Sequence, residues 1–131
     1  MNQAQPKFCV ELIERALNRA KKPVNGSNIL ILGTSYKGGV GDTRESPALK
    51  IIAHLQALGG DVRYHDPYVP DLPRLGLSSV DLESALSAAD LVAIVTAHPG
   101  IDYENVVRAS AEVVDLRGTT RGIDAENLTR L

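Results

Sequence analysis

The 131-residue chain has little cysteine and few aromatic residues: one cysteine, no tryptophan, one phenylalanine and 4% aromatic residues overall. A single cysteine excludes an internal disulfide and is typical of a reducing compartment, so we expect a cytoplasmic protein. Cys9 lies between Phe8 and Val10 with no basic or glycine-rich surroundings, which predicts a packed residue and not a reactive thiol. The three histidines lack metal-ligand spacing, so we predict no metal site.

Long hydrophobic runs and a strong charge bias are also missing. No apolar stretch approaches the roughly 20 residues that a membrane helix needs, and the amino terminus lacks the apolar segment of a secretory signal. The net charge is -2 and the isoelectric point about 5.9, which argues against a nucleic-acid binder. We therefore expect neither a membrane nor a nucleic acid as partner.

Apolar periodicity predicts an α/β domain. Strands alternate with helical segments, a pattern typical of a Rossmann-like parallel sheet flanked by helices and here preceded by an amino-terminal amphipathic helix. The expected strands are 28–32, 61–65, 91–96 and 112–116, and the expected helices are 6–21, 47–58, 81–89, 103–109 and a short, frayed 122–131. Residues 66–79 contain three prolines and are expected to form an extended loop. Right-handed crossovers then bring the loops after the strands to one edge of the sheet.

The most informative segment is 33–47, which joins the first strand to the next helix. It contains four glycines, Lys37 and Arg44, and it leads into Ser46-Pro47, a typical helix start. Glycines permit close backbone approach and cations attract phosphate, so a ligand site is expected here. The alternative is a flexible surface turn with two solvated cations.

Two common phosphate-binding motifs are absent from this segment. A P-loop would need Lys and Ser or Thr where Gly39 and Val40 stand. A G-x-G-x-x-G dinucleotide motif fails at Ser35 when counted from Gly33, and at Arg44 when counted from Gly39. Any phosphate is therefore expected to be held by side chains more than by a backbone cradle.

Three segments together resemble a known family. They are Gly33–Pro47, with Tyr-Lys and Asp-Thr-Arg-Glu-Ser-Pro; Tyr64–Pro70, with Asp-Pro-Tyr-Val-Pro; and Val113–Gly118. The chain resembles the carboxyl-terminal, UDP-binding domain of the UDP-glucose/GDP-mannose dehydrogenase family. Thr96-Ala97-His98, followed by Ile101-Asp102-Tyr103, is similar to the branch that oxidises UDP-N-acetylhexosamines such as UDP-N-acetylmannosamine.

The resemblance implies roles for four residues. Tyr36 stands where an aromatic residue packs at the UDP site, and Lys37 where a lysine contacts the nucleotide sugar. Arg117 stands where an arginine binds the substrate, although from the sequence alone it could simply pair with Asp115. Arg44 matches an arginine that reaches across a cleft to NAD. No residue of the chain is expected to be catalytic.

The resemblance also implies a larger, NAD-dependent and homo-oligomeric enzyme. That enzyme would oxidise the sugar C6 alcohol to a carboxylate in two hydride transfers, using a catalytic cysteine outside this chain. Residues 1–25 would be the tail of a central connecting helix and residues 26–131 the nucleotide-sugar-binding domain, which alone should be inactive. The alternative is a free-standing nucleotide-binding or interaction module.

Several other polar residues are expected to be structural. Asp42 and Glu45 should order the loop around Lys37 and Arg44, and His98, before Pro99-Gly100, should be a loop residue. His65 either touches a ligand or belongs to a plain turn with Asp66-Pro67. At Gly38-Gly39 many relatives carry polar or charged residues, which questions the rigidity of the loop.

Overall fold

The structure is a computed structural model that describes residues 5–131. Its centre is a five-stranded sheet with the strand order β2-β1-β5-β6-β7, in which every pairing is parallel. The strands are β1 (Asn28–Leu32), β2 (Asp61–His65), β5 (Leu91–Ile94), β6 (Val113–Asp115) and β7 (Leu128–Arg130). The predicted Rossmann-like parallel sheet is confirmed.

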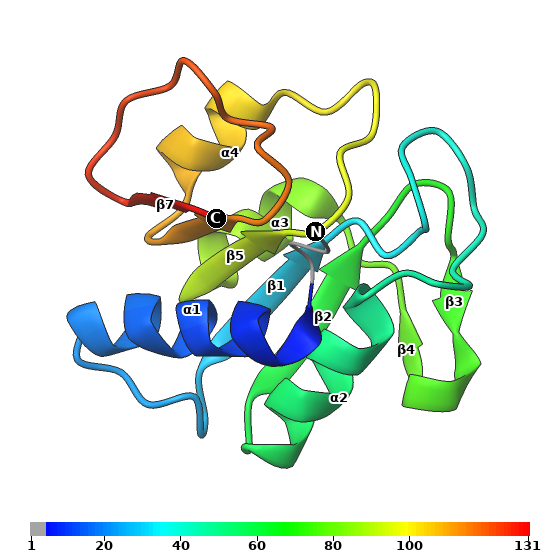
Figure 1. Cartoon of the computed structure of the whole chain (residues 1–131), viewed down its shortest axis with the longest axis horizontal. Helices are drawn as coiled ribbons and strands as arrows, with labels where there is room; N and C mark the ends of the chain where they lie inside the picture. Colours follow the sequence, from blue (N-terminus) through cyan, green and yellow to red (C-terminus); the bar gives the residue numbers. More distant parts are fainter. Residues whose placement is uncertain (1–4) are drawn as a thin grey trace.

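Helices cover both faces of this sheet (Figure 1). Helices α1 (Pro6–Arg19) and α2 (Ala48–Ala57) pack on one face, and α3 (Leu82–Ala88) and α4 (Tyr103–Ala109) pack on the other. Alternate side chains of β1 serve the two layers, with Ile31 in the core of α1 and α2 and Leu32 in the core of α3 and α4. Burial on both faces explains why β1 is a continuous apolar run.

The amino-terminal helix α1 is part of the first of these two cores. It buries Cys9, Ile13 and Leu17 completely, whereas Phe8 remains 43% exposed. The prediction that Cys9 is a packed residue is confirmed, and burial raises the pKa of its thiol. The division of the chain into residues 1–25 and 26–131 stays a prediction.

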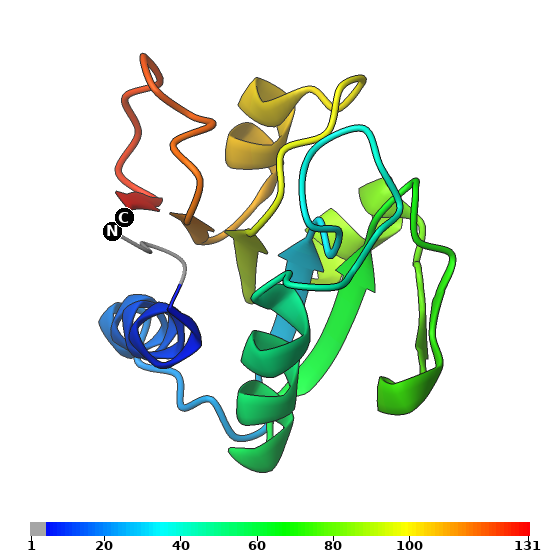
Figure 2. The ribbon, with the colours of Figure 1, turned by 45° about the vertical axis from the view of Figure 1, so that its right-hand side comes forward.

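The order of the strands reverses between β1 and β5. The chain runs from β1 through α2 to β2 on one side, and then through α3 to β5 on the other side of β1. Loops that follow strands on either side of such a reversal lie next to each other, and open α/β sheets bind ligands there. Figure 2 shows the loops after β1 and β5 side by side at this edge of the sheet.

Two predicted elements are wrong. The extended loop at 66–79 contains a small hairpin formed by β3 (Asp71–Leu72), a 3-10 turn (Pro73–Leu75) and β4 (Leu77–Ser78). The frayed helix at 122–131 is instead the edge strand β7, whose parallel pairing supplies partners for the backbone of β6. The other elements match the prediction, with ends that differ by up to two residues. Within residues 5–131, no helix combines the length and apolarity needed to cross a membrane.

Candidate functional site

The loop after β1, residues 33–47, is fixed against two neighbouring loops; we call it the β1 loop. A Cβ atom at Gly38 would lie 2.1 Å from the carbonyl oxygen of Ala97, and one at Gly41 would lie 2.5 Å from that of Tyr68. Gly39 has a φ of +77°, a conformation that favours glycine. These glycines let the β1 loop pack closely against the loops that carry Ala97 and Tyr68. The close packing supports a rigid loop despite the two consecutive glycines.

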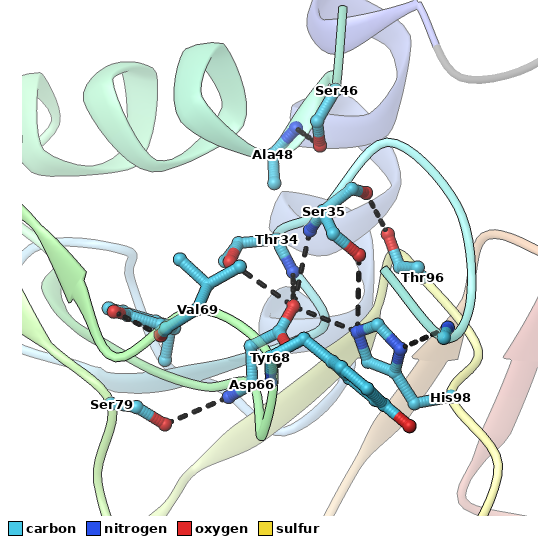
Figure 3. Close-up of polar contacts among 12 residues, drawn as sticks. Thr34, Ser35, Ser46, Ala48, Asp66, Tyr68, Val69, Ser79, Thr96 and His98 are labelled. Atoms are coloured by element: carbon cyan, nitrogen blue, oxygen red, sulfur yellow. Dashed lines mark hydrogen bonds and ion pairs between the residues drawn. The ribbon is translucent and has the colours of Figure 1, made fainter. Parts of the chain in front are cut away.

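A buried carboxylate after β2 organises the start of the β1 loop (Figure 3). Asp66 is 1% exposed, and its Oδ2 accepts hydrogen bonds from the backbone N–H groups of Thr34 (2.7 Å) and Ser35 (3.2 Å). Its Oδ1 accepts from the backbone N–H of Tyr68 at 2.8 Å. One side chain therefore joins the loops after β1 and β2.

His98, in the loop after β5, completes this network (Figure 3). Its Nε2 lies 2.9 Å from Asp66 Oδ2 and 3.2 Å from Ser35 Oγ, and its Nδ1 accepts from the backbone N–H of Gly39 at 2.9 Å. The residue is 3% exposed, and its ring lies 4.7 Å, centre to centre, from the ring of Tyr68. His98 lies in a loop as expected, but it is buried and bonded at both ring nitrogens, which the sequence did not indicate.

The electrostatics of Asp66 follow from these contacts. Burial by itself raises the pKa of this carboxyl, but hydrogen bonds from Thr34 N–H, His98 and Tyr68 N–H outweigh the burial. The net effect is a pKa below the usual range for aspartate. Asp66 is therefore an anion at neutral pH, and it holds its loop partners as an acceptor.

A second buried carboxylate organises the loop that carries Arg117. Asp115, at the end of β6, accepts hydrogen bonds from the backbone N–H groups of Arg117 (3.0 Å), Gly118 (3.0 Å) and Thr120 (2.7 Å). Burial raises the pKa of Asp115, but hydrogen bonds led by the Thr120 hydroxyl outweigh it and lower the pKa overall. Within residues 5–131, the ion pair between Arg117 and Asp115 that the sequence left open does not form.

The structure brings the four predicted site residues to one edge of the sheet. Tyr36, Lys37 and Arg44 lie on the β1 loop, and Arg117 follows β6; all four side chains are exposed. Arg44 is held by Asp42, with Nη2 and Oδ2 2.9 Å apart, and this hydrogen bond lowers the pKa of Asp42. The predicted role of Asp42 in ordering the loop is thus confirmed.

A cleft of about 870 Å³ opens beside the β1 loop. It lies between the start of α2 and the β3–β4 hairpin, and Arg44, Lys50 and Arg74 contribute cations to its wall. Tyr36, Lys37 and Arg117 do not line it. The cleft and the exposed cations after β1 and β6 are therefore different surfaces that share only Arg44.

The sequence places Asp66 among the polar residues at this edge without assigning it a role, and it does not predict His98 as a member of the site. The one available signal was that each follows a strand next to β1, so that both reach the same edge. Of the two readings left open for His65, the structural one is supported, since its Nδ1 lies 2.7 Å from the carbonyl oxygen of Val80. Among residues 5–131, no group of three or more His, Cys, Asp or Glu side chains has a metal-binding arrangement.

The doubly wound fold, with an ordered cationic loop at its switch point, is typical of a nucleotide-binding α/β domain. Residues 30–122 match the UDP binding domain of the UDP-glucose/GDP-mannose dehydrogenase family. The chain belongs to this family of nucleotide-sugar dehydrogenases and represents its carboxyl-terminal, UDP-binding domain.

Individual relatives agree with this assignment. The chain is 31% identical to the UDP-N-acetyl-D-mannosamine dehydrogenase of Pyrococcus horikoshii, over 90% of this chain and 28% of that protein. It is 33% identical to an NDP-N-acetyl-D-galactosaminuronic acid dehydrogenase of Ralstonia nicotianae, with the same coverage of both. The chain therefore spans a little over a quarter of the length of these curated relatives.

Solved structures give the same result. The UDP-D-ManNAc dehydrogenase of P. horikoshii superposes with a TM-score of 0.79 at 29% identity, over 95% of this chain and 30% of that one. A UDP-glucose dehydrogenase from Pyrobaculum islandicum gives 0.78 at 29% identity, over 98% of this chain and 29% of that one. The predicted family is confirmed by both kinds of comparison.

Proposed function

We propose that this domain holds the UDP part of a nucleotide sugar within an NAD-dependent nucleotide-sugar 6-dehydrogenase. The complete enzyme oxidises the C6 alcohol of the sugar to a carboxylate, and the residues that carry out this chemistry lie outside the chain. The observation that carries the proposal is the presence of two exposed cations, Lys37 and Arg117, on ordered loops at the edge where this fold binds nucleotides.

The spacing of the strands suits a diphosphate. Lys37 and Arg117 follow β1 and β6, which are separated by β5 alone. Two strand spacings amount to about 10 Å, so two long side chains from these loops can converge on one pyrophosphate group. Within residues 5–131 neither side chain takes part in an ion pair, so neither has to give up a carboxylate in order to bind phosphate.

Tyr36 supplies the aromatic component of this site. Its ring is 48% exposed and precedes Lys37 directly. An exposed aromatic face beside a phosphate-binding cation is suited to packing against the uracil or ribose of UDP. Tyr36, Lys37 and Arg117 together form the proposed substrate-binding set.

Arg44 is proposed to serve NAD and not the sugar nucleotide. Its side chain is 88% exposed and its only ion-pair partner within residues 5–131 is the neighbouring Asp42, so the guanidinium fits contact with an anionic group held by another domain. NAD supplies the hydride acceptor when it is bound. Arg44 then contributes charge and orientation at the border between the two ligands.

The remaining assignments concern the complete protein. We infer a UDP-N-acetylhexosamine as substrate, supported by the names of the relatives from P. horikoshii and Methanocaldococcus jannaschii, although a UDP-glucose 6-dehydrogenase from Bacillus subtilis is also 34% identical. We infer that helix α1 forms part of the connection into the parent enzyme, which is cytoplasmic and homo-oligomeric. Alone, the 131-residue chain binds UDP without turnover.

Isothermal titration of the 131-residue chain with UDP tests this proposal. Lys37→Ala and Arg117→Ala should each weaken binding by about ten- to a hundredfold, because a charge-assisted contact is worth roughly 1.5–3 kcal/mol. Arg44→Ala should change it little. Arg15→Ala is the matched control, since Arg15 is an exposed arginine of α1 near the opposite edge of the sheet. The proposal fails if Lys37→Ala and Arg117→Ala bind UDP as the wild type does.

A further inference from the structure

We propose that His98 is the positioning residue that fixes the Lys37 segment of the β1 loop for UDP, and that it does so as the neutral Nε2–H tautomer. The inference rests on the proposed role of Lys37. His98 itself does not reach the ligand, because its side chain is fully buried. It acts through the backbone on both sides of Lys37.

The contacts of His98 bracket Lys37 along the chain. On one side, Nδ1 accepts from the backbone N–H of Gly39. On the other side, Nε2 contacts Ser35 Oγ, and the same hydroxyl donates to the carbonyl oxygen of Lys37 at 2.9 Å. The position of the Lys37 backbone thus depends on both nitrogens of one imidazole ring.

The partners determine which nitrogen carries the proton. A backbone N–H can only donate, so Nδ1 must offer a lone pair to Gly39. Asp66 is an acceptor, so Nε2 must carry the hydrogen that lies 2.9 Å from Oδ2. The Ser35 hydroxyl donates its hydrogen to the Lys37 carbonyl oxygen, and its oxygen accepts a bifurcated hydrogen bond from Nε2–H. One tautomer satisfies all of these bonds.

A second proton on the ring would break this arrangement. A hydrogen on Nδ1 would point at the N–H of Gly39, so that one side of the Lys37 segment would lose its anchor. The titratable groups that face His98 are the Asp66 carboxylate after β2, the ring of Tyr68, and the hydroxyl of Tyr103 in α4, which accepts from the His98 backbone N–H at 2.9 Å. Nε2–H can donate to Asp66 in either protonation state of the ring, but the Gly39 contact exists only in the neutral one.

Two variants of His98 test the roles of the two ring nitrogens separately. In His98→Asn the amide oxygen can replace Nδ1 as acceptor for Gly39, whereas in His98→Gln the amide nitrogen can replace Nε2 as donor to Asp66. Both variants lose the contact with the ring of Tyr68, so each serves as the control for the other. We expect His98→Gln to expose the Gly39 amide to hydrogen exchange and to weaken UDP binding about three- to tenfold relative to His98→Asn.

The measurements are amide exchange at Gly39 by NMR, UDP titration, and circular dichroism to verify that both variants are folded. A folded His98→Gln that keeps wild-type UDP affinity would overturn the proposal. If the wild type does not bind UDP, the proposed function is wrong, and the anchoring of the loop is then decided by the exchange rate at Gly39 alone.

Discussion

Gly38 lies so close to Ala97 that a Cβ atom on Gly38 would be 2.1 Å from the Ala97 carbonyl oxygen. This contact joins the loop after β1 to the loop after β5, at the point where the strand order reverses. The neighbouring bond between the Gly39 N–H and His98 Nδ1 joins the same two loops. The segment proposed to bind phosphate is therefore held by backbone packing on one side and by a buried histidine on the other.

Replacing Gly38 by alanine should displace this segment. A distance of 2.1 Å to a backbone oxygen cannot be relieved by a rotamer change, so the two loops must separate. We expect Gly38→Ala to reduce UDP affinity at least tenfold and to destabilise the chain by about 1–3 kcal/mol. UDP titration and chemical denaturation measure the two effects.

Gly60→Ala is the control for this substitution. Gly60 lies at the other end of the sheet, before β2, and a Cβ there would meet the Leu55 carbonyl oxygen at 3.1 Å, a distance that small shifts can accommodate. UDP affinity should stay at the wild-type value in this variant. Equal affinities for Gly38→Ala and the wild type would show that the close approach of the two loops is unimportant for the ligand.

The buried carboxylate of Asp66 should make stability depend on pH in the acid range. Its pKa in the folded chain is lower than the ordinary value for aspartate, so the unfolded chain takes up the proton first as the pH falls. The contribution of Asp66 is therefore complete above about pH 5 and is lost as the pH falls below 4 toward the folded pKa. Denaturation curves at several pH values should show this loss.

Asp66→Asn should remove part of that dependence. An amide has one oxygen and one NH2 group, so even if its oxygen still accepts from Thr34 and His98, its N–H hydrogens face the N–H of Tyr68. We therefore expect a loss of about 3 kcal/mol at pH 7 and a flatter acid profile. Asp124→Asn, at an exposed carboxylate, is the control and should change neither quantity. If the stability of Asp66→Asn falls with pH as steeply as that of the wild type, Asp66 is not the source of the acid dependence.

The buried phenol of Tyr64 should make stability depend on pH in the alkaline range. It is completely buried and donates to the Val69 carbonyl oxygen at 2.8 Å; burial, together with the charges of Asp71 and Asp66, raises its pKa to about 12. Because the folded pKa is above the unfolded value of about 10, the stability due to the protonated phenol is complete below pH 10 and is lost between pH 10 and 12.

Tyr64→Phe tests this prediction. The variant should be about 1 kcal/mol less stable at pH 7, because the Val69 carbonyl loses its donor, and it should lose less stability than the wild type between pH 10 and 12. Tyr36→Phe, on the exposed ring, should follow the wild-type alkaline curve. The interpretation fails if Tyr64→Phe and the wild type lose stability in parallel over this range.

In the complete enzyme, the cations of the β1 loop should affect different ligands. Lys37→Ala should mainly raise KM for the UDP-sugar, whereas Arg44→Ala should mainly raise KM for NAD, each by about ten- to a hundredfold. Steady-state kinetics with each ligand varied in turn measures the difference. If Arg44→Ala changes only KM for the UDP-sugar, both residues serve the same ligand.

The sequence by itself determined the local elements and the family of the domain. The limits of β1 (Asn28–Leu32), β2 (Asp61–His65) and α4 (Tyr103–Ala109) could be predicted to the residue. A buried apolar run predicts β1, and the alternation of apolar and polar residues predicts β2; turn residues mark the ends of the elements within a few positions. The placement of Lys37 and Arg117 at one edge followed from the parallel connections in the same way.

The tertiary structure alone decided how the site is ordered. Asp66 and His98 are 32 positions apart, and neither burial nor tautomer can be inferred until the loops after β2 and β5 are placed beside the β1 loop. The edge strand β7 was missed for a related reason, because its short polar sequence has no strong preference of its own and becomes a strand by pairing with β6. Buried polar groups take their state from their partners, and those partners meet only when the chain is folded.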